Sequence, residues 1–198
     1  DEAVVGPVAV RSESYIGPAI GRELMQKTQA AILLSLAMML IYIWIRFQLQ
    51  WGFAAVAALT HDTLIVLGLF SLFQKELTLP VVAAFLTLVG YSVNDTVVVF
   101  DRVRENLRLR RGEGLESVMN DSINQVLSRT IITSGTTLVV VLTLYIFGGD
   151  VINTFALVLL VGILVGTYSS IFVAAPVALW VNGLLVARRE RRRSKGRR

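Results

Sequence analysis

Two aspartates and an arginine stand inside long apolar stretches of this 198-residue chain. Asp62 and Asp95 each interrupt a long, mainly apolar stretch, and Arg129 stands at the entry to another. On insertion scales, an Asp near the middle of a membrane costs about 2.5–3.5 kcal/mol. Ionisable residues in membrane spans usually face the bundle interior and belong to ion pathways or proton relays. These three side chains are therefore the first candidates for function.

The chemistry open to Asp95 and Arg129 is proton exchange controlled by conformation. Burial disfavours the charged form of a carboxyl group, whereas a neighbouring Arg favours it. If a moving helix makes and breaks the contact between Asp95 and Arg129, Asp95 can take a proton from one side of a membrane and release it to the other. The alternative is a static ion pair that holds a helix bundle together. The residues alone leave both interpretations open.

Other polar residues lie next to these in the sequence and are candidates for relay or packing roles. They are His61, Asp62, Asn94, Thr133 and Ser134. His61 and Asp62 form either a second relay station or a capping and packing pair. Thr133 follows Arg129 by one helical turn, which makes it the best functional candidate among the hydroxyl residues of "RTIITSGTTL". Most of those hydroxyls are expected to serve close helix packing.

Other chemistries fit the sequence poorly. An intramembrane aspartyl protease requires Tyr-Asp and Gly-x-Gly-Asp settings, but the two aspartates stand in "THDT" and "SVNDT". No phosphate-binding loop is present, which argues against ATP hydrolysis by this chain. With no Cys and one His, the chain has no thiolate or multi-histidine metal site.

The elements that must position these residues are membrane-spanning helices. Hydrophobic residues make up 55% of the chain, above the roughly 45–50% of soluble domains. A bilayer core requires about 20 mainly apolar helical residues. Five stretches qualify: 29–47, 51–73, 79–100, 130–147 and 151–186. The last is too long for one simple span, and Pro176 is expected to kink or end it. The sequence therefore predicts an all-α membrane protein, a helical bundle of five transmembrane spans.

Lys and Arg predict the orientation of this bundle. Eight of the nineteen basic residues lie in residues 188–198, and Arg102 and Arg104 begin a second basic cluster after the third span. Basic segments stay on the cytoplasmic side, so the C-terminus is expected inside and the N-terminus of the chain outside, with Arg102 and Arg104 as orientation anchors. Nucleic acid, with ribosomal RNA as the most plausible form, is the rival partner for a basic tail. The apolar content argues against it.

This orientation also predicts the depths of the charged residues. Asp62 lies roughly 16 Å and Asp95 roughly 9 Å from the inner ends of their spans at 1.5 Å per residue. Arg129 enters from the same side. All three fall in the inner half of the membrane, where they could meet across antiparallel helices.

The whole chain is expected to divide into three parts. Residues 1–27 are expected to be the end of an extracytoplasmic α+β domain, followed by the membrane bundle at 28–187 and a basic cytoplasmic tail at 188–198. The chain is thus expected to be the C-terminal part of something longer. Residues 113–128 predict an amphipathic helix that lies on the inner membrane surface and leads into the fourth span. An ordinary helical linker packed on its neighbours is the alternative.

A family resemblance is carried by several motifs in order along nearly the whole chain. They are "ALTHDTLIVLG", "GYSVNDTVVVFDRVREN", "SINQVLSRTIITSGTTL", "FGG" and "FALVLLVGILVGTYSSIFVAAPV". Together they resemble SecF, or the SecF half of a fused SecDF protein-export protein, in the RND superfamily. That family typically has six spans, with a ferredoxin-like extracytoplasmic domain between the first two. This chain departs from the pattern because the first span and most of that domain are missing.

The resemblance implies a function and partners. It implies a non-enzymatic subunit of the Sec machinery in the bacterial inner membrane, which draws unfolded polypeptide outward at the expense of the proton gradient, or of sodium in some members. Implied partners are SecD, the SecYEG channel, a YajC-like small subunit, the exported polypeptide and membrane lipids, without DNA. No cofactor is implied beyond the transported ion.

The family's essential aspartate and arginine fall on Asp95 and Arg129, and its His-Asp pair on His61 and Asp62. The alternatives are an RND-type exporter of lipids or small molecules, and a structural membrane subunit. Co-purification of SecD or SecY with the chain would distinguish the Sec subunit from the RND-type exporter.

Overall fold

The computed structural model describes residues 26–27, 29–30, 33–35, 37–39, 41–42, 45, 49–76, 78–110 and 112–195. The chain forms two compact units, Asp1–Met38 and Met39–Arg198, and the account below concerns the second. The expected end of an extracytoplasmic domain at 1–27 and much of the first expected span at 29–47 lie outside the described residues.

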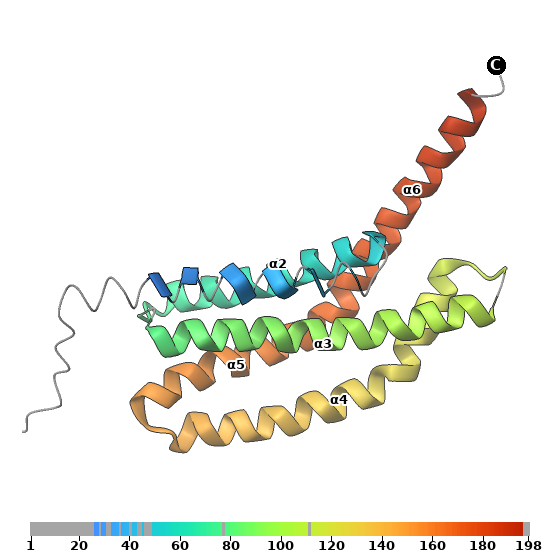
Figure 1. The fold of residues 1–198 in the computed structure, drawn as a ribbon. Coiled ribbons are helices and arrows are strands. Elements are labelled where there is room, and N and C mark those ends of the chain that lie inside the picture. The colour runs from blue at the N-terminus through green and yellow to red at the C-terminus, as the bar shows by residue number, and fades with distance from the viewer. Residues whose placement is uncertain are drawn as a thin grey trace, which may run out of the picture. The chain divides into compact units, whose positions relative to one another are not determined.

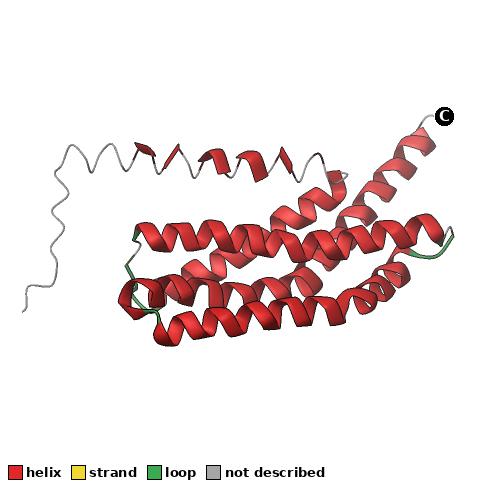
Figure 2. Cartoon of the chain, turned by 60° about the horizontal axis from the view of Figure 1, so that its bottom comes forward, coloured by secondary structure: helices red, strands yellow, loops and turns green. Residues whose placement is uncertain are grey.

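The second unit is built from helices (Figures 1 and 2). In chain order they are α2 (Leu49–Leu72), α3 (Leu79–Leu109), α4 (Leu115–Phe147), α5 (Gly149–Ser169), the π-helix η1 (Ser170–Ala174) and α6 (Ala175–Lys195). Within the described ranges there is no β-strand, and four helical segments are long and apolar enough to cross a membrane: Trp51–Leu72, Leu79–Leu109, Leu115–Phe147 and Ile152–Arg188. The all-α class is therefore confirmed for the described residues, and the fifth span stays a prediction.

Short links place consecutive helices antiparallel (Figure 1). The α2–α3 link turns through Gln74, whose φ of 49° is left-handed, and the α4–α5 link turns through Gly149 at φ 69°. The left-handed region strongly favours glycine, which explains Gly149 at this tight turn. As a result α3 and α5 run parallel and lie side by side in the bundle.

Two helices extend further than the sequence predicted. The third expected span ended at residue 100, but α3 continues to Leu109. The expected amphipathic helix at 113–128 and the fourth span are one continuous helix, α4. Polar side chains join the extensions: Asn106 Nδ2 donates to Ser122 Oγ at 2.8 Å, and Arg102 Nε donates to Gln125 Oε1 at 2.6 Å. These bonds hold α3 and α4 together beyond the apolar part of the bundle.

The first turns of α4 pack on their neighbours. Val118 and Met119 are buried, as is Ser122, on the side that faces the bundle. This packing favours the interpretation of the segment as a helical linker on its neighbours. Its contact with a membrane surface stays a prediction.

The expected break near Pro176 takes the form of a π-helix. Proline has no N–H to donate and its ring clashes with the carbonyl group four residues earlier, here that of Phe172. The wider π-helical turn of η1, which includes Phe172, comes directly before α6. Pro insertions and π-bulges are the usual causes of sharp helix kinks. Accordingly α6 leaves the bundle in a different direction from α5 (Figure 1).

The interior of the bundle has two apolar cores with a polar layer between them. The Trp51 core includes Trp51 and Phe100, whose ring centroids lie 5.2 Å apart, together with Met119. The Leu88 core includes Leu88 and Ile163. Along the helices, buried polar residues separate the two cores. This polar layer consists of Asp62, Ser92, Asp95, Thr96, Thr130, Ser134, Ser169 and Ser170, with the half-buried Thr167.

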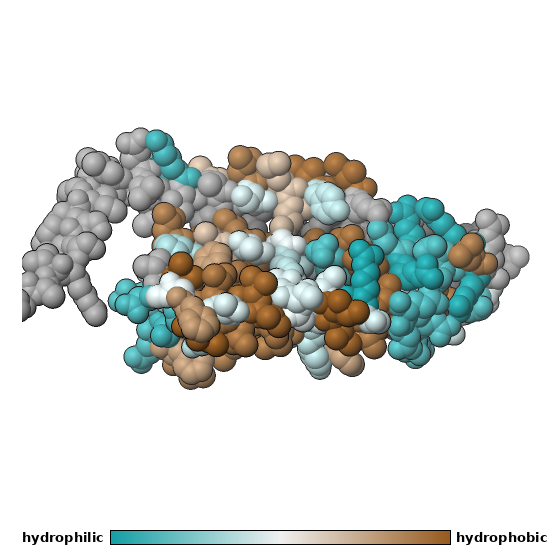
Figure 3. Space-filling model, turned by 90° about the horizontal axis from the view of Figure 1, so that it is seen from below, coloured by the Kyte–Doolittle hydropathy of each residue, from teal (hydrophilic) through white to brown (hydrophobic). Residues whose placement is uncertain are grey.

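The outer surface matches this interior. Large exposed apolar side chains, such as Ile132, Val139 and Phe172, cover the helices outside the core. Figure 3 shows brown apolar patches on one face of the bundle, with hydrophilic residues gathered at the end where α3 meets α4. An apolar band of this kind is expected of helices that face lipid.

Candidate functional site

Asp95 lies in the polar layer and is 2% exposed. It is presented by α3, and its Oδ2 atom accepts a hydrogen bond from Ser134 Oγ of α4 at 3.2 Å and a long one from Thr167 Oγ1 of α5 at 3.5 Å. Thr167 Oγ1 also donates to Ser134 Oγ at 2.8 Å. Three helices thus meet at this carboxyl group, and neutral hydroxyls are its hydrogen-bond partners.

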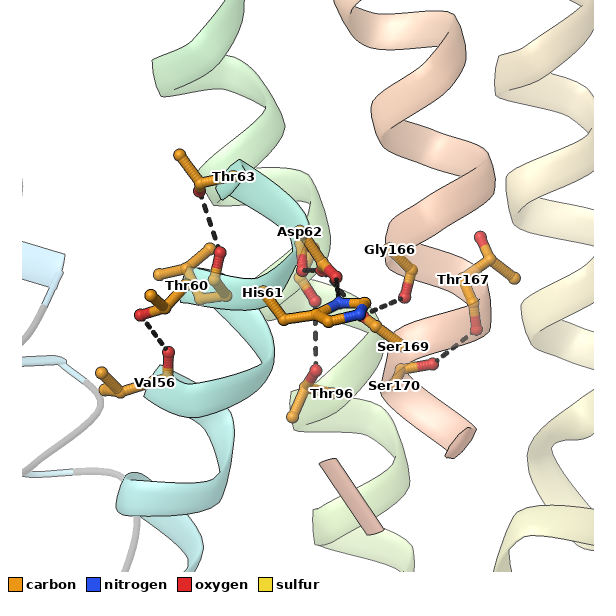
Figure 4. A network of polar contacts seen from close by, with 12 residues as sticks. Val56, Thr60, His61, Asp62, Thr63, Thr96, Gly166, Thr167, Ser169 and Ser170 are labelled. Atoms are coloured by element: carbon orange, nitrogen blue, oxygen red, sulfur yellow. Dashed lines mark hydrogen bonds and ion pairs between the residues drawn. The ribbon is translucent and has the colours of Figure 1, made fainter. Parts of the chain in front are cut away.

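Asp62 lies in the same layer and is fully buried. Its Oδ2 atom accepts hydrogen bonds from Ser92 Oγ of α3 at 2.6 Å and from Ser169 Oγ of α5 at 2.7 Å. Its Oδ1 atom lies 3.0 Å from Nδ1 of His61, whose side chain is 36% exposed. Figure 4 shows His61 and Asp62 on α2 directed towards Ser169. The carboxyl group therefore ties α2, α3 and α5 together.

Close packing of α3 against α5 makes these bonds possible. A Cβ atom added to Gly166 would lie 3.3 Å from Ser92 Cβ, and one added to Gly162 would lie 2.3 Å from Leu88 Cδ1. The two glycines lie one turn apart on α5, in the small-xxx-small spacing that permits close packing of helices. Their lack of side chains brings the hydroxyls of the following turn within reach of both carboxyl groups.

The structure does not bring Arg129 to Asp95. Within the part of the chain that the structure describes, no ion pair joins the two side chains, and Arg129 is exposed. It lines an open pocket of about 500 Å³ with Asp101 and Glu105. Arg129 precedes Ser134 by five positions, so it is turned about 140° around the axis of α4 at 100° per residue. The two residues therefore belong to different faces of one helix.

Three other candidates divide between the layer and the surface. Ser134 contacts Asp95, whereas Thr133 is exposed and donates to the carbonyl groups of Arg129 and Thr130 in its own helix, at 2.9 and 3.1 Å. Asn94 is exposed on α3 and points away from the layer. The expectation that Thr133 is the best hydroxyl candidate is therefore not supported by its position, which favours Ser134.

The predicted orientation anchors lie in the extension of α3. Arg102 donates to Gln125 and pairs with Glu105 at 2.7 Å, and Arg104 lines a surface pocket with Asp101. Beyond them, Arg110 donates to Asp121 at 2.5 Å and pairs with Glu113. The hydrogen bond to Asp121, followed by the charge of Glu113, raises the pKa of Arg110 above its ordinary value. Arg102 thus joins α3 to α4 in addition to any role in orientation.

Sequence reasoning missed three hydroxyls that bond directly to the two carboxyl groups: Ser92, Thr167 and Ser169. Two of them, Thr167 and Ser169, lie in "VGILVGTYSS", where Gly162 and Gly166 stand at a spacing that favours close helix packing. The available signal was the polar "TYSS" directly after the second glycine, inside an apolar helix. Among the described residues, no group of three or more His, Cys, Asp or Glu side chains could hold a metal ion.

Long apolar helices around buried, hydroxyl-bound carboxyl groups define the class of polytopic helical membrane proteins with an intramembrane ionisable site. Residues 2–183 match the family described as "Protein export membrane protein SecD/SecF, C-terminal". The chain belongs to this family of protein-export membrane proteins.

Relatives support this assignment. The chain is 52% identical over 187 residues to "Protein translocase subunit SecF" of Koribacter versatilis, which covers 94% of this chain and 45% of the relative. It is 57% identical to the SecF of Desulfurispirillum indicum over 81% of this chain and 52% of the relative. The chain thus spans about half the length of these relatives.

Solved structures agree with the fold. The crystal structure of SecDF from Thermus thermophilus, described as a translocon-associated membrane protein, matches 84% of this chain with a TM-score of 0.79 and 48% identity. A structure of SecDF in a super-membrane-facing form matches 91% of the chain with a TM-score of 0.75 and 45% identity. This chain covers 23% and 24% of those two chains.

Proposed function

We propose that the chain is the membrane part of a SecF-type subunit that uses an ion gradient to promote polypeptide export through the Sec machinery. The observation that carries this proposal is Asp95, a carboxyl group buried between two apolar cores and bound by hydroxyls of α4 and α5. The relatives named protein translocase subunit SecF and the SecDF structures support the assignment to export.

In this proposal Asp95 is the protonation site and Arg129 its conformation-dependent partner. The hydroxyls of Ser134 and Thr167 can bond to either form of a carboxyl group, because a hydroxyl both donates and accepts. When α4 turns or the Arg129 side chain swings inward, the guanidinium approaches Asp95 and favours release of its proton. Each proton that crosses the membrane supplies about 2.3 kcal/mol per 100 mV.

The protein works in the bacterial inner membrane with its C-terminus in the cytoplasm. Its partners are SecD, the SecYEG channel, a YajC-like small subunit, the unfolded polypeptide and the surrounding lipids. It performs no covalent chemistry and requires no bound cofactor, because the transported proton, or sodium ion, is the source of energy.

Asp95→Asn in the full-length protein tests this function. Asn keeps the shape of the side chain but cannot take up and release a proton, so gradient-dependent export is expected to fall to the level of cells that lack the protein. Asp150→Asn, the same chemical change at an exposed position of α5, is the matched control and should export normally. Unchanged export in Asp95→Asn membranes would contradict the proposal.

Two further measurements complete the test. The proton gradient and the sodium gradient are dissipated in separate experiments. The coupling ion is the one whose loss of gradient stops export. Purification of the intact complex should recover SecD and SecY with this chain, whereas an exporter of lipids or small molecules would be recovered without them.

A further inference from the structure

The proposed function makes no use of Asp62, although this side chain is fully buried in the polar layer. A buried carboxyl group is costly unless it is paired and hydrogen-bonded. Asp62 accepts bonds from Ser92 of α3 and Ser169 of α5, and it contacts His61 of its own helix. These hydrogen bonds satisfy the buried carboxylate, and they also connect α2, α3 and α5 at one point.

Both carboxyl groups hold the same turn of the chain. Thr167 donates to Asp95 and Ser169 donates to Asp62, and the two donors are two positions apart at the end of α5. Ser169 also donates to the carbonyl group of Gly166 at 3.2 Å, within this turn (Figure 4). The bonds to the two carboxyl groups are therefore connected through residues 166–169.

This turn leads directly into the π-helix. Ser169 is the last residue of α5 and Ser170 the first of η1, after which α6 leaves in another direction (Figure 1). π-helical turns occur mostly as single turns inside α-helices, and they are frequent at functional sites. The two carboxyl groups thus bind the chain at the beginning of the bend.

We propose that Asp62 is a positioning residue, which acts through Ser169 to fix the α5–η1 junction so that the state of Asp95 is transmitted to α6. The proposal rests on the proposed function for the role of Asp95, but the position of the junction can be measured independently of export.

The groups around Asp62 agree with a positioning role. His61 of α2 is the titratable group that contacts Asp62, while α3 and α5 contribute the hydroxyls of Ser92 and Ser169. Tyr168, on the same turn, points outward and stacks on Phe172 with ring centroids 4.7 Å apart. The side chains of α3 and α5 that bond to Asp62 are therefore neutral hydrogen-bond donors.

Spin labels on either side of the bend test the inference. Leu164 of α5 and Leu184 of α6 are exposed, and the chain has no Cys, so Leu164→Cys and Leu184→Cys provide the two sites in the full-length protein in lipid. Ser169→Ala and Asp62→Ala are expected to shift and broaden the distance distribution between the labels. Ser170→Ala is the matched control, because Ser170 is equally buried but donates to a backbone carbonyl group three residues earlier, that of Thr167, and not to a carboxyl group.

The same variants are then compared in gradient-dependent export. Loss of one hydrogen bond to a charged group is large enough to reduce a rate about tenfold. The rate of gradient-dependent export should therefore fall by about that factor in Ser169→Ala and in Asp62→Ala. Asp62→Asn retains an oxygen that can accept from both serines and should recover a large part of the activity lost in Asp62→Ala.

The outcomes separate this inference from the proposed function. If Asp95→Asn abolishes export while Ser169→Ala leaves both the distances and export as in the wild type, the positioning role is wrong and the proposed function stands. Equal distance changes in Ser169→Ala and Ser170→Ala would also overturn it, because they would indicate general loosening of the junction. An export defect in Asp62→Asn as severe as that in Asp95→Asn would assign proton transfer to Asp62 and overturn its positioning role.

Discussion

At the scale of single residues, a carboxyl group inside an apolar bundle depends on its immediate donors. Asp95 has the hydroxyls of Ser134 and Thr167, which come from two different helices. Bonds of this kind stabilise the buried group without fixing its protonation state, since hydroxyls adapt by rotation. A direct bond to a guanidinium would instead hold the carboxyl group ionised. The observed donors therefore suit a group that must change its state.

Ser134→Ala tests the importance of these donors. Ser134 is buried and contacts Asp95, whereas its neighbour Thr133 is exposed and bonds to its own helix. Removal of a buried donor leaves its partner less well satisfied, at a cost of about 1–3 kcal/mol. We expect gradient-dependent export to fall about tenfold or more in Ser134→Ala. Thr133→Ala, the adjacent control, should stay near the wild type, and equal defects in the two variants would contradict the assignment.

At the scale of elements, the register between α3 and α5 decides which groups meet. Gly162 lies against Leu88 and Gly166 against Ser92, so the two helices approach closely along parallel directions. This approach places Ser92, Thr167 and Ser169 in one layer with the carboxyl groups. Packing of small residues is the main source of helix association where lipid removes the hydrophobic driving force.

Gly162→Ala is expected to destabilise the bundle. The new Cβ would lie 2.3 Å from Leu88 Cδ1 and 2.9 Å from its Cγ, and Leu88 is fully buried with little room to move. Overpacking of this kind costs about 1–3 kcal/mol. Reversible unfolding in mixed micelles measures the effect on the free energy of unfolding.

Gly135→Ala on α4 is the control, because nothing lies within 4 Å of the added Cβ. Ala is also the better helix former by up to about 1 kcal/mol, so this variant should be as stable as the wild type or slightly more so. A Gly162→Ala protein with unchanged stability would show that α3 and α5 can move apart freely.

At the scale of the whole bundle, the polar layer is enclosed by apolar cores on both sides. Trp51 and Phe100 belong to one core, and Leu88 and Ile163 to the other. Beyond the Trp51 core, α3 and α4 continue as polar, cross-linked extensions that end in Arg110 and Glu113. The basic residues of these extensions are of the kind that membrane insertion retains in the cytoplasm.

Cysteine labelling tests the orientation that follows. The chain has no Cys, so Lys75→Cys in the α2–α3 link and Glu113→Cys in the α3–α4 link each provide one site, both exposed. A membrane-impermeant maleimide added to cells with a permeable outer membrane should modify Lys75→Cys directly. It should modify Glu113→Cys only after the inner membrane is opened, and the reverse pattern would contradict the proposed orientation.

The sequence by itself determined that the protein is helical, and it identified the two carboxyl groups that are candidates for function. Helix formation in lipid depends on local apolar composition, because every backbone group must be bonded within its own segment. Isolated charges such as Asp62 and Asp95 are conspicuous against that background. Pro176 marked the break for the same local reason, since it lacks an N–H group.

Only the tertiary structure decided which side chains surround the carboxyl groups. Successive residues on a helix are rotated by about 100°, so Ser134 faces Asp95 while Thr133 is exposed and Arg129 lies on another face. Ser92, Thr167 and Ser169 join the layer because glycines set the register of α3 against α5. That register depends on contacts between distant parts of the chain, and no local pattern in the sequence contains it.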